Sequence, residues 1–312
     1  MTAAFARRAP LAVALALATV YLVWGSTYLA IRVTDRTMPP FLMSSVRFLI
    51  AGVALYAFAS RGRARPTLKE WRAAAIVGAA LLLVGNGGVA WAETRLESGL
   101  AALIVAMMPL WVALMDRLFF GRRLSLPAIV GLFVGFGGVA LLVGPGGGAN
   151  VVAMLVLVGT TAAWAGGSLY ARGAKLPESP LLSAAMQMLA AGVFLGFFGL
   201  ATGEGGSIGA DTFATKPVIA FVYLVLVGSL IAFSAYAWLL KNVRISLVAT
   251  YAFVNPVVAV ALGTVFLSEP IGWTTISAGA AIVVAVVLIV TARTPVPKAG
   301  EKRFPAPLKA AA

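Results

Sequence analysis

Ten apolar stretches, each about as long as a helix that crosses a membrane, constrain this chain more than any other feature of its sequence. A bilayer core is about 30 Å thick, and roughly 20 apolar helical residues cross it. Soluble domains carry about 25% charged residues, whereas this chain carries 11% and has a mean hydropathy of +0.99. The sequence therefore predicts an all-α integral membrane protein. Its ten predicted transmembrane helices span about 11–31, 40–59, 73–92, 98–116, 126–143, 151–171, 181–200, 217–239, 246–267 and 273–291.

The positions of the basic residues predict the orientation of these helices. If the N-terminus is cytoplasmic, inner segments hold 19 of the 24 Lys and Arg residues and outer loops hold four, with Arg47 inside a stretch. Cytoplasmic loops carry an excess of Lys and Arg, so we expect both termini to be cytoplasmic. The first stretch follows Arg7 and Arg8 as a signal peptide would. We interpret it as a true span because it is about 21 residues long and lacks a small-residue cleavage site.

The two halves of the chain resemble each other at an offset of about 140 to 147 residues. Trp24 aligns with Trp164 and Pro40 with Pro180, while the acidic outer loop 93–97 aligns with the basic inner loop 240–244. The charge changes sign where five spans per half would reverse the topology, which indicates a 5+5 inverted-topology repeat. We expect repeats at 11–143 and 151–291, an outer linker at 144–150, a cytoplasmic N-terminus at 1–10 and a disordered cytoplasmic tail at 292–312.

Composition excludes several classes of function. The chain has no Cys and no His, which rules out thiolate nucleophiles, Ser-His-Asp triads and imidazole metal sites. We expect no enzyme activity, no metal and no cofactor. The net charge of +14 lies in loops between apolar stretches, so it indicates topology and not nucleic-acid binding. Inverted repeats place a binding site near the bilayer midplane and open it alternately to each side. The sequence thus predicts a transporter for a small molecule, for which a monomer suffices.

Several short motifs also resemble those of a known family. They are the run 23–28 (Val-Trp-Gly-Ser-Thr-Tyr), the pair at 39–40 (Pro-Pro), the run 46–49 (Val-Arg-Phe-Leu), the run 120–124 (Phe-Gly-Arg-Arg-Leu) and the run 266–270 (Phe-Leu-Ser-Glu-Pro). This pattern resembles the EamA family of the drug/metabolite transporter superfamily over residues 11–291. One departure is Arg122, where many members carry an acidic residue. The resemblance implies a ten-helix inner-membrane exporter of amino acids or other small metabolites, and it does not specify the substrate.

Arg47 is the sharpest candidate for a substrate contact. Ionisable side chains inside a span are costly and therefore suggest function. Arg47 lies about seven residues into the second stretch, roughly 10 Å below the outer surface at about 1.5 Å per residue. Its guanidinium could pair with a substrate carboxylate; a cap on a broken helix end or a snorkelling side chain is the competing interpretation. Its counterpart in the second half is the neutral Gln187.

Glycines and prolines inside the stretches suggest bends. Asn86 lies in a glycine-rich run with Gly85 and Gly87, which either admits a ligand close to the backbone or serves helix packing. Asn255 and Pro256 are expected to break the ninth stretch near its centre, as Pro109 is expected to break the fourth. Such kinks at matching places are candidate hinges, with a passive kink as the alternative.

Aromatic and other polar side chains complete the predicted site. Trp24 and Trp164 occupy equivalent midspan positions, where an indole could line or gate a cavity. Six weaker candidates, which more often serve packing, are Tyr28, Met107, Ser168, Ser234, Tyr236 and Tyr251.

The absence of acidic residues deep inside a span bears on energy coupling. Proton-coupled carriers usually hold an Asp, Glu or His there, whereas Asp116, Glu93 and Glu269 lie at the ends of predicted spans. We expect facilitated export without obligatory proton exchange. A multidrug exporter of hydrophobic cations is the alternative function, although the positive charge of Arg47 would repel such substrates.

Overall fold

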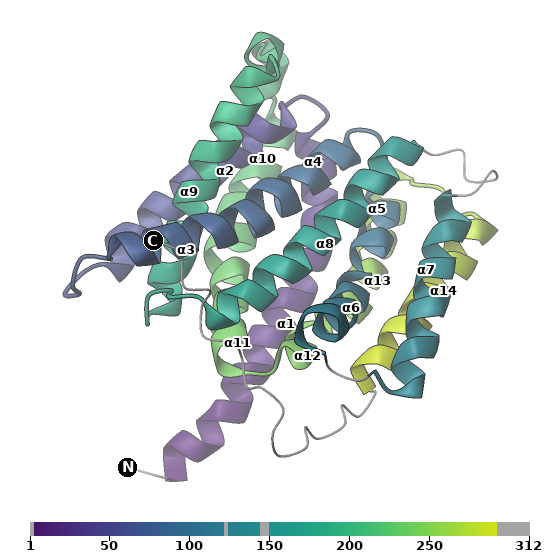
Figure 1. Ribbon diagram of the computed structural model, residues 1–312. Helices are drawn as coiled ribbons and strands as arrows, with labels where there is room; N and C mark the ends of the chain where they lie inside the picture. The colour runs from purple at the N-terminus through teal and green to yellow at the C-terminus, as the bar shows by residue number, and fades with distance from the viewer. Residues whose placement is uncertain (1–2, 122–123, 144–149, 292–312) are drawn as a thin grey trace.

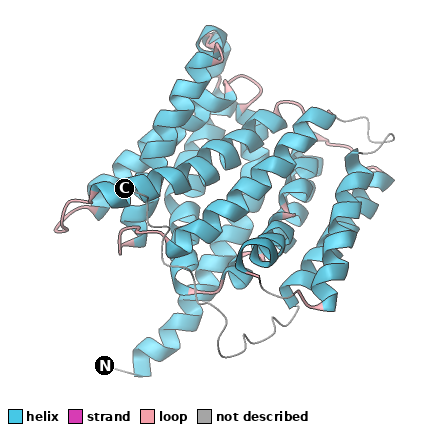
Figure 2. Ribbon diagram, in the orientation of Figure 1, coloured by secondary structure: helices cyan, strands magenta, loops and turns pink. Residues whose placement is uncertain are grey.

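Every regular element is helical over the part of the chain that the computed structural model describes, residues 3–121, 124–143 and 150–291 (Figures 1 and 2). The predicted tail 292–312, residues 144–149 of the predicted linker and the basic pair at 122–123 lie outside the described residues. The first half contains α1 (Ala3–Thr34), α2 (Pro40–Ala59), α3 (Leu68–Gly78), η1 (Ala79–Gly87), α4 (Gly88–Glu93), α5 (Ser98–Val105), α6 (Met108–Phe120) and α7 (Leu126–Val143).

The second half contains ten further elements. They are α8 (Val151–Gly173), α9 (Pro180–Ala201), η2 (Glu204–Ser207), η3 (Ala210–Phe213), α10 (Thr215–Tyr223), η4 (Leu224–Phe233), α11 (Ser234–Asn242), α12 (Ile245–Val248), α13 (Tyr251–Leu267) and α14 (Trp273–Thr291). Several helices begin at a capping residue or at a proline. Side chains of Thr67, Asn150 and Ser179 cap α3, α8 and α9, and Pro40 and Pro180 each occupy a first turn, where proline costs no hydrogen bond.

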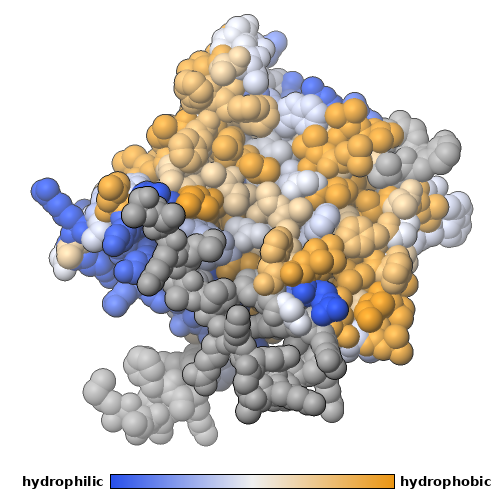
Figure 3. All heavy atoms as spheres, in the orientation of Figure 1, coloured by the Kyte–Doolittle hydropathy of each residue, from blue (hydrophilic) through white to orange (hydrophobic). Residues whose placement is uncertain are grey.

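Seven continuous helical segments are long and apolar enough to cross a membrane: Pro10–Thr34, Pro40–Ala59, Leu68–Glu93, Ser98–Phe119, Val151–Gly173, Pro180–Ala201 and Thr215–Asn242. Three shorter apolar helices, Leu126–Leu141, Val254–Leu267 and Trp273–Ile289, coincide with the remaining predicted stretches. Large apolar side chains are exposed on the surface, as in Phe133 (78%) and Phe197 (77%), and Figure 3 shows wide apolar areas. Soluble monomers rarely expose such areas. The chain is an all-helical, multi-pass membrane protein.

Helices of the two halves pack directly against each other. The pairs α2–α9 and α7–α14 make the most extensive contacts, and Figure 1 shows α7 beside α14. Glycines permit the close approach: a Cβ added at Gly192 would lie 2.8 Å from Leu49 Cγ, and one at Gly131 would lie 2.8 Å from the carbonyl oxygen of Ala285. The small-residue pairs at 131/135 and 192/196 therefore serve helix packing.

The prediction that Asn255–Pro256 breaks the ninth stretch is wrong. Helix α13 continues through Pro256, and the break lies earlier, in a turn at Ala249–Thr250. A proline removes one backbone hydrogen bond, and the neighbouring bonds of α13 carry the helix past it. In the fourth stretch the break lies at Ala106–Met107, and Pro109 sits in the first turn of the following helix α6, a favourable place for proline.

Candidate functional site

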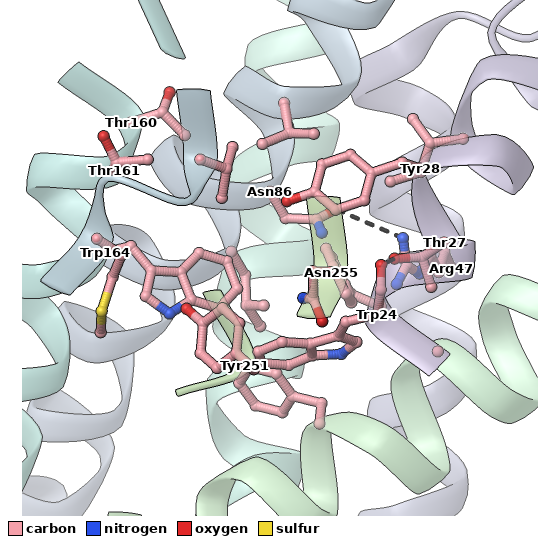
Figure 4. Close-up of a pocket in the computed structure, with 18 residues that line it drawn as sticks. Trp24, Thr27, Tyr28, Arg47, Asn86, Thr160, Thr161, Trp164, Tyr251 and Asn255 are labelled. Carbon is pink, nitrogen blue, oxygen red and sulfur yellow. Dashed lines mark hydrogen bonds between the residues drawn. The ribbon is translucent and has the colours of Figure 1, made fainter. Parts of the chain in front are cut away.

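A cavity lies between the two halves of the chain (Figure 4). Its volume is about 50 Å³, smaller than the pockets of about 300–1,000 Å³ that bind drug-sized ligands. Elements of both halves form its walls, and most of the side chains are aromatic or apolar. The lining residues are Trp24, Thr27, Tyr28, Ile31, Arg47, Phe48, Leu82, Asn86, Val89, Val105, Met108, Thr160, Thr161, Trp164, Gly228, Phe233, Tyr251 and Asn255.

Arg47 is the charged residue of this lining. It follows Ser44 by three residues and precedes Ala51 by four, so all three share the buried face of α2, and only 3% of Arg47 is exposed. Its Nε donates to Ser229 Oγ at 2.7 Å, and its Nη1 donates to Asn86 Oδ1 at 3.5 Å. Among the described residues, no carboxylate accepts a hydrogen bond from this guanidinium. The cavity therefore contains a buried cation held by neutral partners.

Both partners of Arg47 come from π-helical segments. Asn86 lies in η1, inside the third predicted span, and Ser229 lies in η4, inside the eighth. Wide turns of this kind are rare and occur frequently at functional sites. Gly85 and its neighbour Gly88 allow η1 to pack tightly, since added Cβ atoms would meet the Trp164 ring at 2.5 Å and Thr160 Oγ1 at 2.3 Å. Both glycines therefore serve close packing against α8, and the approach of a ligand to this run stays a prediction.

Four aromatic rings form a cluster along one side of the cavity. The Trp24 ring lies 5.5 Å from Trp164, 4.7 Å from Tyr236 and 5.4 Å from Tyr251, measured between centroids. The Tyr236 hydroxyl accepts a hydrogen bond from Trp164 Nε1 at 3.0 Å and lies 2.8 Å from Ser168 Oγ. These bonds satisfy the polar atoms of buried rings. We call this cluster of Trp24, Trp164, Tyr236 and Tyr251 the aromatic wall.

Polar contacts near this wall join α1 to the second half. With its amide nitrogen turned toward them, Asn255 donates to the backbone oxygens of Tyr251 at 3.2 Å and Tyr21 at 2.9 Å. The Tyr21 hydroxyl also forms a hydrogen bond with Thr250 Oγ1 beside the break in the ninth stretch. These contacts bind α1 to α13 and to the turn that precedes it.

The structure brings seven of the ten predicted substrate contacts into the cavity: Trp24, Tyr28, Arg47, Asn86, Trp164, Tyr251 and Asn255. The other three lie elsewhere. Met107 is fully buried among core residues and its neighbour Met108 lines the cavity. Ser168 is buried beside Tyr236. Gln187 lines a second cavity. Of the predicted hinges, Gly85 and Gly87 lie in η1, Pro109 in α6 and Pro256 in α13.

The second cavity has a volume of about 220 Å³ and is bordered by α8, α9, η4 and α11. Arg172, Lys241, Ser183 and Gln187 supply polar groups to its walls, and Gln187 Nε2 donates to Ser183 Oγ at 2.9 Å. Phe233 lines both cavities, and Tyr236 of the aromatic wall lines this one. The counterparts Arg47 and Gln187 therefore occupy separate cavities on either side of that wall.

Sequence reasoning missed several residues of the site. Ser229, the nearest partner of Arg47, and the cavity-lining Thr27, Thr160 and Thr161 were not singled out. A hydroxyl group inside a helix can bond to a carbonyl of the preceding turn, so it produces little signal in an apolar sequence. Within the part of the chain that the structure describes, no group of three or more His, Cys, Asp or Glu residues is placed to hold a metal ion.

The sequence of this chain is similar to those of known membrane transporters. The sequence pattern of the EamA-like transporter family matches residues 11–144 and residues 151–291. The chain is 41% identical over 278 residues, 88% of its length and 89% of the relative's, to the "Uncharacterized inner membrane transporter YedA" of Escherichia coli K12. It is 27% identical to the "Uncharacterized transporter YvbV" of Bacillus subtilis 168, covering 92% of this chain and 93% of the relative.

Two further similarities are more distant. A protein of Streptantibioticus cattleyicolor named "Probable terminal-alkyne amino-acid exporter" is 28% identical, covering 81% of this chain and 85% of that protein. A solved crystal structure superposes with a TM-score of 0.65 at 21% identity, covering 89% of this chain and 96% of that one. The likeness to the solved structure concerns the fold alone.

Proposed function

The chain belongs to the EamA-like transporter family and is a membrane transporter, and we propose that it exports small metabolites, with amino acids as the first candidates, across the inner membrane by alternating access. The observation that carries this proposal is Arg47, a buried cation in a central cavity with no carboxylate partner among the described residues. The relative named as an amino-acid exporter adds support.

The proposal includes a topology of ten spans in two inverted repeats, 11–143 and 151–291, with both termini in the cytoplasm. Seven long and three shorter apolar helices at the expected places support the number of spans. The two π-helical segments occur in corresponding spans of the halves, and the cavity lies between the halves. In this orientation the turns 35–39, 94–97, 202–214 and 268–272 lie outside, and the second cavity lies toward the cytoplasm.

The chemistry of the cavity favours a carboxylate with an apolar or aromatic side chain. An Arg guanidinium has five N–H donors, and Ser229 and Asn86 accept from only two of its nitrogens. The remaining donors can bind a carboxylate through two parallel hydrogen bonds. Trp24, Trp164 and Tyr251 would then pack against the substrate side chain (Figure 4). None of the lining residues is acidic, which suits facilitated export and disfavours a cationic substrate.

The proposal can be tested by counterflow in proteoliposomes with one unlabelled amino acid inside and its labelled form outside, without an ion gradient. We expect uptake by the wild-type chain and at least about a 30-fold loss in Arg47→Ala, because removing one partner of a buried charge pair costs about 2 kcal/mol or more. The control Arg61→Ala removes the same charge from an exposed loop and should transport normally.

Two outcomes would contradict the proposal. Amino-acid counterflow that persists in Arg47→Ala would show that Arg47 does not bind the substrate carboxylate. Transport of quaternary-ammonium drugs, with no signal for any amino acid, would favour the multidrug alternative.

A further inference from the structure

Glu204, Glu269, Glu93 and Asp35 are four of the acidic residues that gather at one end of the bundle, the end that the proposed topology places outside, and the first two have hydrogen-bond partners. Glu204 accepts from the backbone N–H groups of Phe41 (3.2 Å) and Leu42 (2.9 Å) at the start of α2. Glu269 accepts from Ser98 N (2.9 Å) and Ser98 Oγ (2.8 Å) at the start of α5. Each carboxylate comes from the second half and holds a helix N-terminus of the first half, where a negative charge is favourable. These contacts join the two halves at this end of the bundle.

The other two acidic residues, Glu93 and Asp35, have no such partners. Glu93 is the last residue of α4 and is 0% exposed, and Asp35 lies in the turn after α1. All four of their carboxyl oxygens are buried and lack a hydrogen-bond partner. Arg32 of α1 donates to the backbone oxygen of Glu93 instead of its carboxylate. Glu93 and Asp35 lie within electrostatic range of each other.

Such groups cannot remain charged at this place. A carboxylate buried without a partner costs so much free energy that the group takes up a proton instead. Burial likewise raises the pKa of Asp35 well above its usual range, although Arg32 opposes the shift. We propose that Glu93, together with Asp35, is a proton-binding site whose protonation from the outside closes the outer end of the transporter.

The charged and titratable groups that face this site come from several elements. Around Glu93 they are Tyr28 and Arg32 of α1, Asp35, and Glu269 after α13. Around Asp35 they are Arg32, Arg47 of α2 and Glu204 of η2, and Glu97 lies near Glu269 and Arg32. Acidic neighbours outnumber basic ones around Glu93, so its negative form gains little from them and the proton is retained while the end is closed.

A consequence follows for transport, and it rests on the proposed topology and on alternating access. Opening the outer end would admit water, so both carboxyl groups would ionise and repel each other. Closing it again would require protons from the outer solution. These protons enter and leave on the same side, so the site makes the return step sensitive to external pH without carrying protons across the membrane. This agrees with facilitated export.

The test uses cysteine accessibility, because the natural chain contains no Cys. Leu96→Cys places a thiol at a buried position (3% exposed) in the outer 94–97 turn, and Ile208→Cys places one at an exposed position (51%) in the α9–α10 connection. Maleimide labelling of the first, divided by that of the second, corrects for the pH dependence of the thiol reaction itself. The full-length chain is reconstituted without substrate, so the result does not depend on which metabolite is exported.

Between about pH 6 and pH 8 we expect the labelling ratio to rise with pH, by up to about tenfold per pH unit for one proton released. In the Glu93→Gln background the ratio should stay low throughout, and in Asp35→Asn the rise should be smaller. The control Glu178→Gln, on an exposed inner loop, should behave as the parent. A ratio that is independent of pH, or a rise that survives in Glu93→Gln, would overturn the proposal, as would a response to sodium ions at constant pH.

A second measurement does not require the outer end to move. Infrared spectra of the closed protein at neutral pH should contain the C=O band of a protonated carboxylic acid. Most of the intensity of this band should be absent in Glu93→Gln. Absence of that band in the folded wild-type chain would overturn the assignment even where a variant folds poorly.

Discussion

Arg47 and Glu93 are both almost completely buried, at 3% and 0% exposure, yet their surroundings differ in kind. The guanidinium donates to Ser229 and Asn86, whereas neither oxygen of the Glu93 carboxyl has a partner. Neutral partners hold the Arg47 guanidinium by hydrogen bonds, and Asp35 attracts it without forming one. Its remaining donors can therefore bind a substrate carboxylate. Around Glu93, Arg32 favours an ionised carboxyl, whereas burial and the acidic neighbours Asp35 and Glu269 oppose it. Burial alone therefore does not indicate which ion a site binds, whereas the hydrogen-bond partners of the buried group do.

The same substitution at both positions gives the sharpest contrast. Arg47→Leu should weaken binding of a carboxylate substrate to the purified carrier by at least about 30-fold. Glu93→Leu should leave that affinity within about twofold and raise thermal stability, because it replaces a buried polar group without partners at a gain of about 1–3 kcal/mol. Isothermal titration calorimetry and thermal unfolding in detergent measure the two effects. A lower melting temperature for Glu93→Leu would mean that the carboxyl has a stabilising partner.

The pH dependence of stability provides the next test. The pKa of Asp35 is raised by burial, so the folded chain holds a proton that the unfolded chain releases at a lower pH. Stability from this group is complete below the ordinary carboxyl value of about 4 and is lost as pH rises from there toward the raised pKa. Melting temperatures should therefore fall with rising pH in the wild-type chain, and less steeply in Asp35→Asn. An unchanged slope in Asp35→Asn would show that its carboxyl is hydrated.

The contrast between the two sites also explains what the sequence could predict. An Arg or Asn within an apolar stretch is costly, so Arg47 and Asn86 stood out, and both line the cavity. Ser229 could not stand out, because a hydroxyl in a helix bonds to its own backbone at little cost. Glu93 lies at a helix end, where an acidic residue normally reaches water, and its burial depends on the packing of α4 against elements far along the chain, such as α8 and α1.

Breaks in the helices show the same limit. The sequence placed the break of the ninth stretch at Pro256, whereas it occurs at Ala249–Thr250, where neither residue disfavours a helix strongly. Contacts made by the turn decide this position, including the bond between Thr250 and Tyr21 of α1. Local propensity cannot report a contact between residues that lie far apart in the chain.

The two partners of Arg47 should differ in importance. Ser229→Ala removes the 2.7 Å hydrogen bond from Nε and should raise KM for a carboxylate substrate about tenfold, since bonds to charged groups contribute about 1.5–3 kcal/mol. Asn86→Ala removes a bond of 3.5 Å, at the limit of hydrogen bonding, and should raise KM about two- to threefold. Initial-rate counterflow at varied substrate concentration measures both. The reverse order would mean that Asn86 binds the substrate itself.

The smallest change asks how firmly the guanidinium is held. A Cβ added at Gly228 would lie 3.1 Å from Arg47 Nη2 and 3.1 Å from Thr27 Cγ2, so one of them must shift by a few tenths of an ångström. Gly228→Ala should therefore raise KM about two- to threefold, a loss of about 0.5 kcal/mol.

Gly159→Ala is the matched control, because it gains the same helix propensity and its Cβ would meet nothing within 4 Å. An unchanged KM in Gly228→Ala, together with a raised KM in Ser229→Ala, would show that the Arg47 guanidinium tolerates a small displacement. It would also show that the hydrogen bond from Arg47 to Ser229 stabilises the buried charge without fixing its position. A measurable rise in Gly228→Ala alone would instead show that Arg47 is fixed by the backbone of η4, the segment that supplies both the hydroxyl and the space beside it.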